Sequence, residues 1–474
     1  MGTLTALLNL SQNALNANQT ALDITSNNVA NANTPGYTDE IATWQENDSV
    51  QLSANAKVGE GASVTALSQR NLVLNQQVNI QTQLQASSSA QSSALNDLQS
   101  IFGITTTSTS SAATTLGTDM NAFYASLSSL QANPADSSVR QNVLSAANTL
   151  AMDFNTASSQ ITQQTSSLNQ QATGAVSKIN SLTSSIASLN LQIEASSPQA
   201  DAGTLEDQRQ QDLTQLSQYI GFSQTRTESN GLTLTTADGT PLVSDGQSYP
   251  LNTSIVNGNA DVISALGQNI TPVLNGTVSG ITGGSLGGIL QARDQDLPTV
   301  STALDSLAYA VGSAVNEVNE NGLDANGNPG EAIFNLPVGP AGAASTISVA
   351  TSSPNAIAAA ALNEGSSGGT NATALNTIVN DPLMNGQTAS QFYASLLTQL
   401  GNTVSGMTNE NTTQQASLTQ LTTQQSSLSS VSLDQEASNL TLYERSYQAA
   451  SKVFTIVDEL MASALNLGEE TTVS

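Results

Sequence analysis

Both ends of the chain carry apolar residues at alternating spacings of four and three positions. Apolar positions that recur every 3.5 residues keep one seam of a helix facing a partner helix, as in a coiled coil. So thin a stripe leaves a helix marginally stable alone in water. We therefore predict that the two terminal helices pair and that further copies of the chain cover the seam. The alternative is that each is an ordinary amphipathic helix packed on its own domain. The predicted self-assembly seam comprises Leu4, Leu8, Leu15, Leu22, Val29, Leu433, Leu440, Tyr443, Tyr447, Phe454, Val457 and Met461.

Helical periodicity returns between residues 71 and 195 and is strongest after Asn133-Pro134. A stripe from Val139 to Ile193 predicts a helix over 136–195, roughly 90 Å long at ~1.5 Å per residue. Gly174 is a possible weak point, because Gly costs ~1 kcal/mol against Ala in a helix. The helices expected to pack on the long one lie near 72–101, 116–132 and 402–430.

Composition changes over residues 196–401, where Gly and Pro become frequent and helical and strand patterns alternate. Gly231 to Val243 predicts a β-hairpin with Asp238-Gly239 at its turn. This stretch is expected to form an inserted domain that starts and ends at the same end of the helical part. The predicted fold is mainly α with an inserted α+β domain. Its parts are terminal coiled-coil helices with a linker (1–70 and 431–474), a long-helix bundle (71–195 and 402–430) and a Gly-rich outer α+β domain (196–401).

The chain has no His and no Cys, which removes His-based triads, thiol nucleophiles, disulfides and the usual zinc-ligand clusters. Nine Lys and Arg against 36 Asp and Glu give a formal charge of -27, which disfavours nucleic acid and anionic membranes as partners. The three lysines lie in unrelated segments, and no pair of carboxylates is tied to a cleft. We therefore predict a protein that is not an enzyme and that binds no cofactor.

Two loops resemble ligand sites, but for both the favoured interpretation is a loop or turn without a ligand. Asp324 to Glu331 is similar to the start of a calcium loop, but Pro329 and Asn335 stand where an EF-hand needs Gly and a bidentate Glu. A tight turn is therefore expected there, and no metal site. Gly283 to Gly288 precedes a helix as a phosphate cradle would, but no Lys-Ser/Thr follows it, so a flexible loop is expected.

The beginning of the chain contains no basic residue before Lys57, so neither a secretory signal peptide nor an Arg-rich transit peptide is expected. No stretch approaches the ~20 apolar residues that a membrane helix needs. Membrane insertion is therefore not expected.

Motifs at the two ends resemble those of bacterial flagellar axial proteins. Asn31-Ala-Asn-Thr-Pro-Gly-Tyr37, after the first helix, is similar to that group's N-terminal signature, and Leu433 to Leu440 is similar to its C-terminal one. Gly-Tyr-Thr at 36–38, together with Asp207-Gln-Arg209 and the segment from Gly284 to Arg293, resembles the FlgK family of hook-associated proteins. The motif residues are Asn27, Asn28, Asn31, Pro35, Gly36, Tyr37, Leu433, Asp434, Asn439 and Leu440.

The resemblance implies a structural role at the hook–filament junction. It implies export through the flagellar type III channel, so that the chain is cytoplasmic before export and part of the extracellular flagellum afterwards. The expected partners are copies of the chain, the hook protein below, a second hook-associated protein above, and an export chaperone within about Leu433–Leu467. The alternatives are another flagellar axial protein (hook, rod or flagellin-like) or a non-flagellar coiled-coil surface protein.

Overall fold

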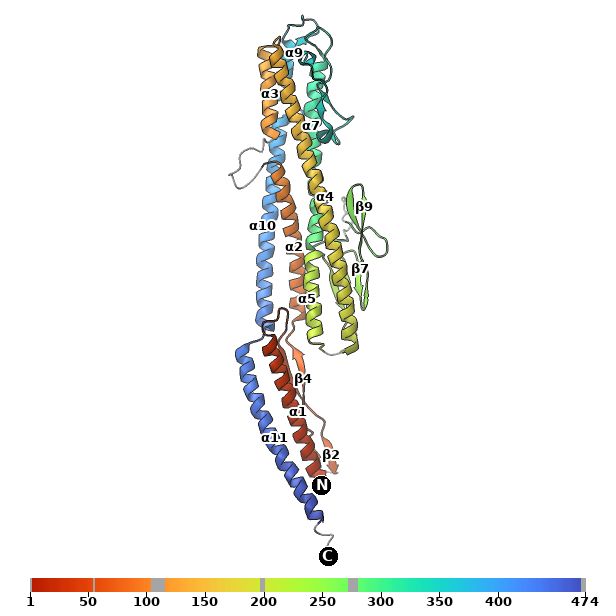
Figure 1. The fold of residues 1–474 in the computed structure, drawn as a ribbon, viewed down its shortest axis with the longest axis vertical. Coiled ribbons are helices and arrows are strands. Elements are labelled where there is room, and N and C mark those ends of the chain that lie inside the picture. The colour runs from red at the N-terminus through yellow and green to blue at the C-terminus, as the bar shows by residue number, and fades with distance from the viewer. Residues whose placement is uncertain (1, 54–55, 104–115, 197–200, 272–279, 470–474) are drawn as a thin grey trace.

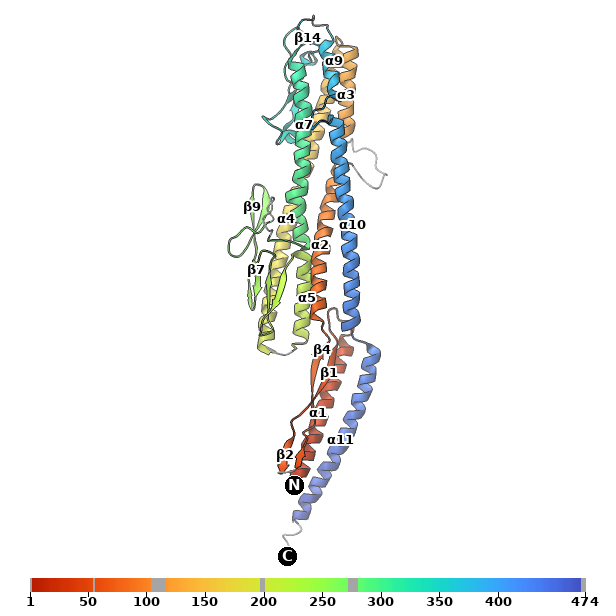
Figure 2. The ribbon, with the colours of Figure 1, turned by 180° about the vertical axis from the view of Figure 1, so that it is seen from behind.

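The structure is a computed structural model, and it describes residues 2–53, 56–103, 116–196, 201–271 and 280–469. The molecule is elongated and mainly helical, with a few small sheets (Figure 1). Helices α1 (Gly2–Asn31) and α11 (Leu433–Glu469) lie side by side at one end, and both termini are there. A bundle of long helices continues along the same axis, as both views show (Figure 2).

The segment after α1 forms a ribbon that runs back along this helix. Strand β1 (Glu40–Glu46) pairs with β4 (Ala62–Ser68) in antiparallel register from Glu40↔Ser68 to Glu46↔Ala62. Strands β2 (Val50–Ser53) and β3 (Ala56–Val58) form the hairpin at its far end. Both β1 and β4 contact α1, so this helix packs on α11 and on the ribbon.

The bundle is built around α4 (Ser137–Ser196), a single helix of 60 residues. The helix continues through Gly174. A Cβ at this position would contact no other atom, so the missing side chain removes no packing contact. Helices α3 (Leu116–Ala132), α5 (Thr204–Tyr219) and α7 (Leu297–Glu320) pack on α4. The expectation that 402–430 packs on the long helix is corrected: α10 (Ala389–Ser429) lies along α2 (Leu72–Ile101).

The region between α4 and α10 does not return to its starting point. The last turn of α4 lies near the terminal pair, whereas α10 begins much farther along the bundle, beside the first turn of α3 (Figure 1). Residues 196–401 therefore run the length of the bundle, because α6 (Gly284–Gln291), the π-helical turn Ala292–Asp296 and α7 lead away from the joint. This corrects the expectation that the insertion starts and ends at one end.

Small strands of this region lie along one flank of α4. Strands β5 (Ser223–Arg226), β6 (Leu232–Thr235), β7 (Pro241–Ser244) and β8 (Gln247–Ser248) form a four-stranded sheet, which contains the predicted hairpin. Strands β9 (Asn252–Val256) and β10 (Asn259–Ile263) form a separate hairpin. The far end holds the remaining short elements: β11 (Gly322–Leu323) with β14 (Ala360–Ala361), β12 (Phe334–Asn335) with β13 (Ser348–Val349), α8 (Ala343–Thr346), α9 (Thr370–Thr377), and 3-10 turns at Pro354–Ala356 and Ile378–Asn380.

Four asparagines of α4 bind the neighbouring strands and loops to this helix. Each side-chain amide can both donate and accept a hydrogen bond. It can therefore pair with a backbone carbonyl or N–H that has no neighbouring strand. Asn180, for example, donates to the Leu251 carbonyl and accepts from the Leu251 N–H, both at 2.8 Å. Backbone groups of the neighbouring strands and loops are thereby satisfied at four points along the helix. The other three are Asn155, Asn169 and Asn190.

Candidate functional site

The terminal pair and its joint to the bundle carry the residues that the sequence singled out. In α1, Leu4, Leu8, Leu15 and Leu22 are half-buried, whereas Val29 is exposed. The fully buried positions of α1 include several small or polar residues between the positions of the predicted seam: Ser11, Ala17, Asn18, Ala21, Thr25 and Asn28.

In α11 the apolar residues of the predicted seam divide between two faces. Tyr443, Phe454 and Met461 are half-buried, and Val457 is buried. The other members of the predicted seam, Leu433, Leu440 and Tyr447, point outward. The Tyr443 ring lies 6.2 Å from that of Trp44 in the ribbon, so α11 also contacts β1. An outward row of Leu442, Val453, Ile456 and Leu460 is exposed as well.

The two end motifs meet at Asn28, which is fully buried. Its Nδ2 donates to the Glu40 carbonyl at 2.7 Å and to Glu436 Oε2 of α11 at 3.2 Å. Its Oδ1 accepts from the Tyr37 hydroxyl at 2.9 Å and from the Glu40 N–H. Asn439 donates to the other oxygen of Glu436 at 3.3 Å. One amide therefore joins the first helix, the turn after it, the ribbon and the last helix.

The other motif residues shape the turn that follows α1. Asn31 donates to the Asn27 carbonyl and accepts from the Thr34 hydroxyl. Pro35 and Gly36 follow, and Gly36 has φ of 82°, a conformation that favours glycine. Asp434 lies exposed in the first turn of α11, where a carboxylate favours the positive end of the helix dipole.

The joint to the bundle is centred on Arg70, whose side chain is 7% exposed. Its guanidinium binds Asp201 at 3.1 Å and both Glu206 and Asp207 at 2.7 Å. Asp207 also accepts from the N–H and hydroxyl of Thr38, directly after the Gly-Tyr motif. The Asp39 N–H donates to the Ser429 carbonyl at the end of α10. These contacts fix the turn after α1 to α5 and α10.

A second polar layer lies behind Arg70. Arg209 is buried and donates to Asn190 Oδ1 of α4 and to the Asn230 carbonyl. Asn230 donates to Glu206 at 2.8 Å, and Arg226 binds the same carboxylate at 3.3 Å from a more exposed position. The motif residues Asp207 and Arg209 therefore face two sides of α5: one faces the terminal pair and the other faces the bundle.

Carboxylates crowd this joint. Burial, and to a smaller extent the negative charge of Glu436, raise the pKa of Asp39 to about 6. Burial also raises the pKa of Glu40, with Asp201 and Asp207 adding to the effect. Burial raises the pKa of Asp201 as well, but hydrogen bonds from Ser68 outweigh it and leave that pKa lowered. The Asp207 hydrogen bond and charge overcome the effect of burial on Arg70 and raise its pKa.

The sequence indicated Thr38 only as part of the Gly-Tyr-Thr motif, and sequence reasoning missed the roles of Arg70 and Glu436, which complete the joint. Arg70 had a usable signal, because it is the only basic residue between Lys57 and Arg140 in a strongly acidic chain. A scarce cation in such a chain is expected to be paired rather than solvated. Glu436 lies within the C-terminal motif but is recognisable only once α1 is placed against it.

The Asp324 loop is a turn closed by its own carboxylate. Asp324 Oδ1 accepts from the Asn326 N–H at 2.8 Å and from the Asn328 N–H at 2.7 Å. In the described part of the chain, no three acidic side chains gather as metal ligands would. The described helices also include none that is long and apolar enough to cross a membrane.

Comparisons with known proteins agree at both ends and in the middle. The family model described as "Flagellar hook-associated protein FlgK helical domain" matches residues 95–334. Those for "Flagella basal body rod protein" and "Flagellar basal body rod FlgEFG protein C-terminal" match residues 8–38 and 424–467. The ends thus match a wider group of rod proteins, and the middle matches a narrower family.

Individual relatives are similar over different lengths. Flagellar hook-associated protein 1 of Bacillus subtilis is 29% identical over 97% of this chain and 97% of its own length. Its Escherichia coli namesake is 29% identical over 70% of this chain and 60% of its own length. The solved hook junction protein FlgK from Burkholderia pseudomallei has a similar fold, with a TM-score of 0.65 at 20% identity over 74% of this chain and 99% of that one.

Proposed function

The chain belongs to the FlgK family of flagellar hook-associated proteins, and from this membership we propose that it is a structural axial protein of the hook–filament junction in the bacterial flagellum. In this role it polymerises on the distal end of the hook through its paired terminal helices. The bundle and the flank of small strands then lie outside the tube formed by those helices.

The observation that carries the proposal is the joint around Asn28 and Arg70. Asn28 joins the two end helices and Arg70 joins their linker to the bundle, so buried polar contacts attach the terminal pair to the bundle. The outward row of α11 stays uncovered within one chain. Exposed apolar rows of this kind mark interaction surfaces, and copies of the chain would cover them in a polymer.

Partners follow from the same role. We infer that the hook protein lies below the junction and a second hook-associated protein lies above it, with the filament beyond. An export chaperone would cover the apolar faces of α11 within Leu433–Leu467 before export. The protein is then cytoplasmic before export and extracellular after it, with a mechanical role rather than an enzymatic one.

The alternatives share parts of this support. Hook, rod and flagellin-like proteins have paired end helices, but the match over residues 95–334 is to the FlgK helical domain. A non-flagellar coiled-coil surface protein would not need the two end motifs to meet at one asparagine. Both alternatives therefore explain less of the chain.

Charges introduced into the outward row of α11 test the proposal. In the full chain, Ile456→Glu with Leu460→Glu should leave the bundle folded but abolish retention at the junction, because a buried carboxylate in an apolar contact is costly. The matched control, Met152→Glu, alters an exposed apolar residue of α4. Motility and the amount of chain on isolated hooks, against the amount in the medium, are the measurements. Normal motility and retention of the α11 variant would contradict the proposal.

A further inference from the structure

The charge of this molecule is unevenly distributed over its helices. The chain carries -27, yet the 30 residues of α2 include Asp97 as the one charged residue, and the 41 residues of α10 include Glu410 alone. Identical copies of an acidic chain repel each other wherever their charged faces approach. Two copies can therefore meet along the side of the bundle formed by α2 and α10 at little electrostatic cost.

The outward face of α2 carries the largest apolar residues on this neutral side. Val73 is 67% exposed, and Ile80 and Leu84 are each 46% exposed. Their spacing of seven and four places them on one face of the helix, as half of a coiled-coil seam. Figure 2 shows α2 between α10 and α5, with this stretch at the base of the bundle.

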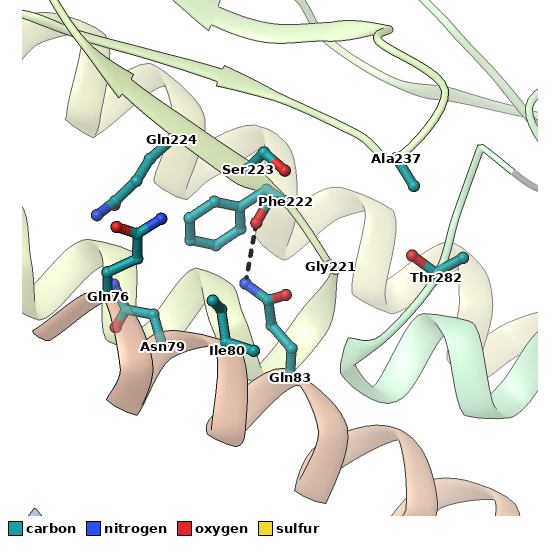
Figure 3. Close-up of a pocket in the computed structure, with 10 residues that line it drawn as sticks. All are labelled: Gln76, Asn79, Ile80, Gln83, Gly221, Phe222, Ser223, Gln224, Ala237 and Thr282. Atoms are coloured by element: carbon teal, nitrogen blue, oxygen red, sulfur yellow. Dashed lines mark hydrogen bonds between the residues drawn. The ribbon is translucent and has the colours of Figure 1, made fainter. Parts of the chain in front are cut away.

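A pocket of about 180 Å³ lies beside this row, between α2 and β5. Carboxamides from both elements line it, with the ring of Phe222 and the side chain of Ile80 between them (Figure 3). Asn79 is 1% exposed and accepts from Gln210 and Thr214. Among the described residues, neither its buried Nδ2 nor the buried Oε1 of Gln224 has a hydrogen-bond partner. One donor and one acceptor beside the pocket thus lack a partner within the described chain, and a carboxamide or hydroxyl side chain carries the complementary groups.

Within the chain, α2 already binds α10 by this chemistry on a neighbouring face. Gln425 donates to Asn75 at 2.7 Å and Gln85 donates to Asn411 at 3.3 Å. Between Val404 and its end at Ser429, α10 has no fully buried apolar residue. Amide contacts are therefore prominent in holding this lower part of α10 to α2. The opposite side of that part is exposed and equally neutral, with Ala416, Gln420 and Thr423 along it.

We propose that the outward face of α2, with its carboxamide pocket, is the lateral contact of the bundle for a second copy of this chain, and that it receives the outer side of that copy's α10. The inference rests on the proposed function in one respect: copies in an axial polymer point the same way. Parallel copies bring different faces together, and such heterologous contacts propagate into rings or helices rather than closing as dimers. Val73, Ile80 and Leu84 then pack on Ala416 and the methyl groups of neighbouring threonines.

Cysteine cross-linking tests this contact cleanly, because the chain has no Cys. A full chain that carries both Ile80→Cys and Gln420→Cys should give a ladder of dimers, trimers and longer species when flagella are oxidised. Each single variant should stay monomeric. The matched control replaces Ile80→Cys by Met152→Cys, an exposed apolar position on α4, and should give no ladder. Dimers from Ile80→Cys alone would overturn the heterologous contact, and no ladder from an assembled junction would overturn the surface itself.

The same samples separate this inference from the proposed function. If the chain occupies the junction and the double variant gives no ladder, the lateral contact is wrong and the function stands. If the chain is not found at the junction, the function fails, and oxidation of the concentrated purified double variant then decides the contact. A ladder there supports the contact, and monomers alone overturn it.

Discussion

The far end of the bundle and the terminal pair are both helical, but they bury very different interiors. Between α3, α4 and the far-end strands, Phe123, Phe154 and Phe334 are at most 1% exposed, and the rings of Phe123 and Phe334 meet edge to face at 5.9 Å. Among the described side chains of the terminal pair, the fully buried apolar ones are Ala17, Ala21, Ile24 and Val457. The first region is complete within one chain. In the proposed polymer, other copies would supply the rest of the second interior.

Truncating one phenylalanine in each region should give the largest contrast. Phe154→Ala should lower the free energy of unfolding of the bundle by about 3–5 kcal/mol, because it removes a fully buried ring and leaves a cavity. Phe454→Ala, in the half-buried seam of α11, should cost the monomer only about 1–2 kcal/mol, because less apolar area is removed from water there. Urea unfolding followed by circular dichroism measures both. Equal losses would mean that the terminal pair of a single chain is as tightly packed as the bundle.

The joint should behave like the bundle rather than like the terminal pair. Arg70→Met leaves the buried carboxylates of Glu206 and Asp207 and the half-buried one of Asp201 without their shared cation, which should cost about 3 kcal/mol. The loss stays at the lower end of such values because backbone N–H groups of Ser68 and Thr38 still bind Asp201 and Asp207. Exchange of those two amides reports the loss. Arg226→Met is the control, since this side chain is 40% exposed and binds Glu206 from the surface, and it should cost under about 1 kcal/mol.

The asparagines of α4 distinguish its packed flank from its exposed one. Asn180→Leu strands both backbone groups of Leu251 and should cost about 1–3 kcal/mol. Asn148→Leu changes an exposed asparagine on the same helix and should alter stability by no more than about 0.5 kcal/mol. Thermal unfolding of the two variants gives the comparison, and similar values would show that the Leu251 contacts contribute nothing.

Periodicity predicted the long helices because their apolar stripes are local. The stripe from Val139 to Ile193 indicated α4 almost to the residue, and Gly174 did not interrupt it. The predicted partner of α10 was wrong, because the lower part of that helix packs through amides such as Gln425, and amides give no apolar pattern in the sequence. Asn28 and Arg70 pair with residues more than 130 positions away, so spacing alone could not reveal their contacts.

The apolar rows of α11 show a related limit. Leu440 and Tyr443 fit one heptad pattern in the sequence, yet the structure turns Leu440 outward while Tyr443 faces Trp44. A helix with apolar residues on adjacent faces is compatible with several seams, and only the placement of α1 and the ribbon selects one. The rows left over are available for the contacts of the proposed polymer.

The smallest expected effect is a pH dependence of the joint, set by Asp39. Its pKa of about 6 in the folded chain exceeds the value of 3.8 for an ordinary Asp, because burial and Glu436 disfavour its charge. The folded state therefore binds this proton more tightly, and the stability that the proton confers is lost as the pH rises from about 4 to 6. The lowered pKa of Asp201 acts in the opposite sense at lower pH, where protonation of that carboxyl destabilises the joint.

Exchange of the Asp39 amide, corrected for its intrinsic rate, should be a few-fold faster at pH 7 than at pH 5. Asp39→Asn should remove this difference, and Asp434→Asn, at an exposed position of α11, should keep it. A pH dependence that survives in Asp39→Asn would assign the proton to another carboxyl of the joint, with Glu40 the first to test because its pKa is also raised.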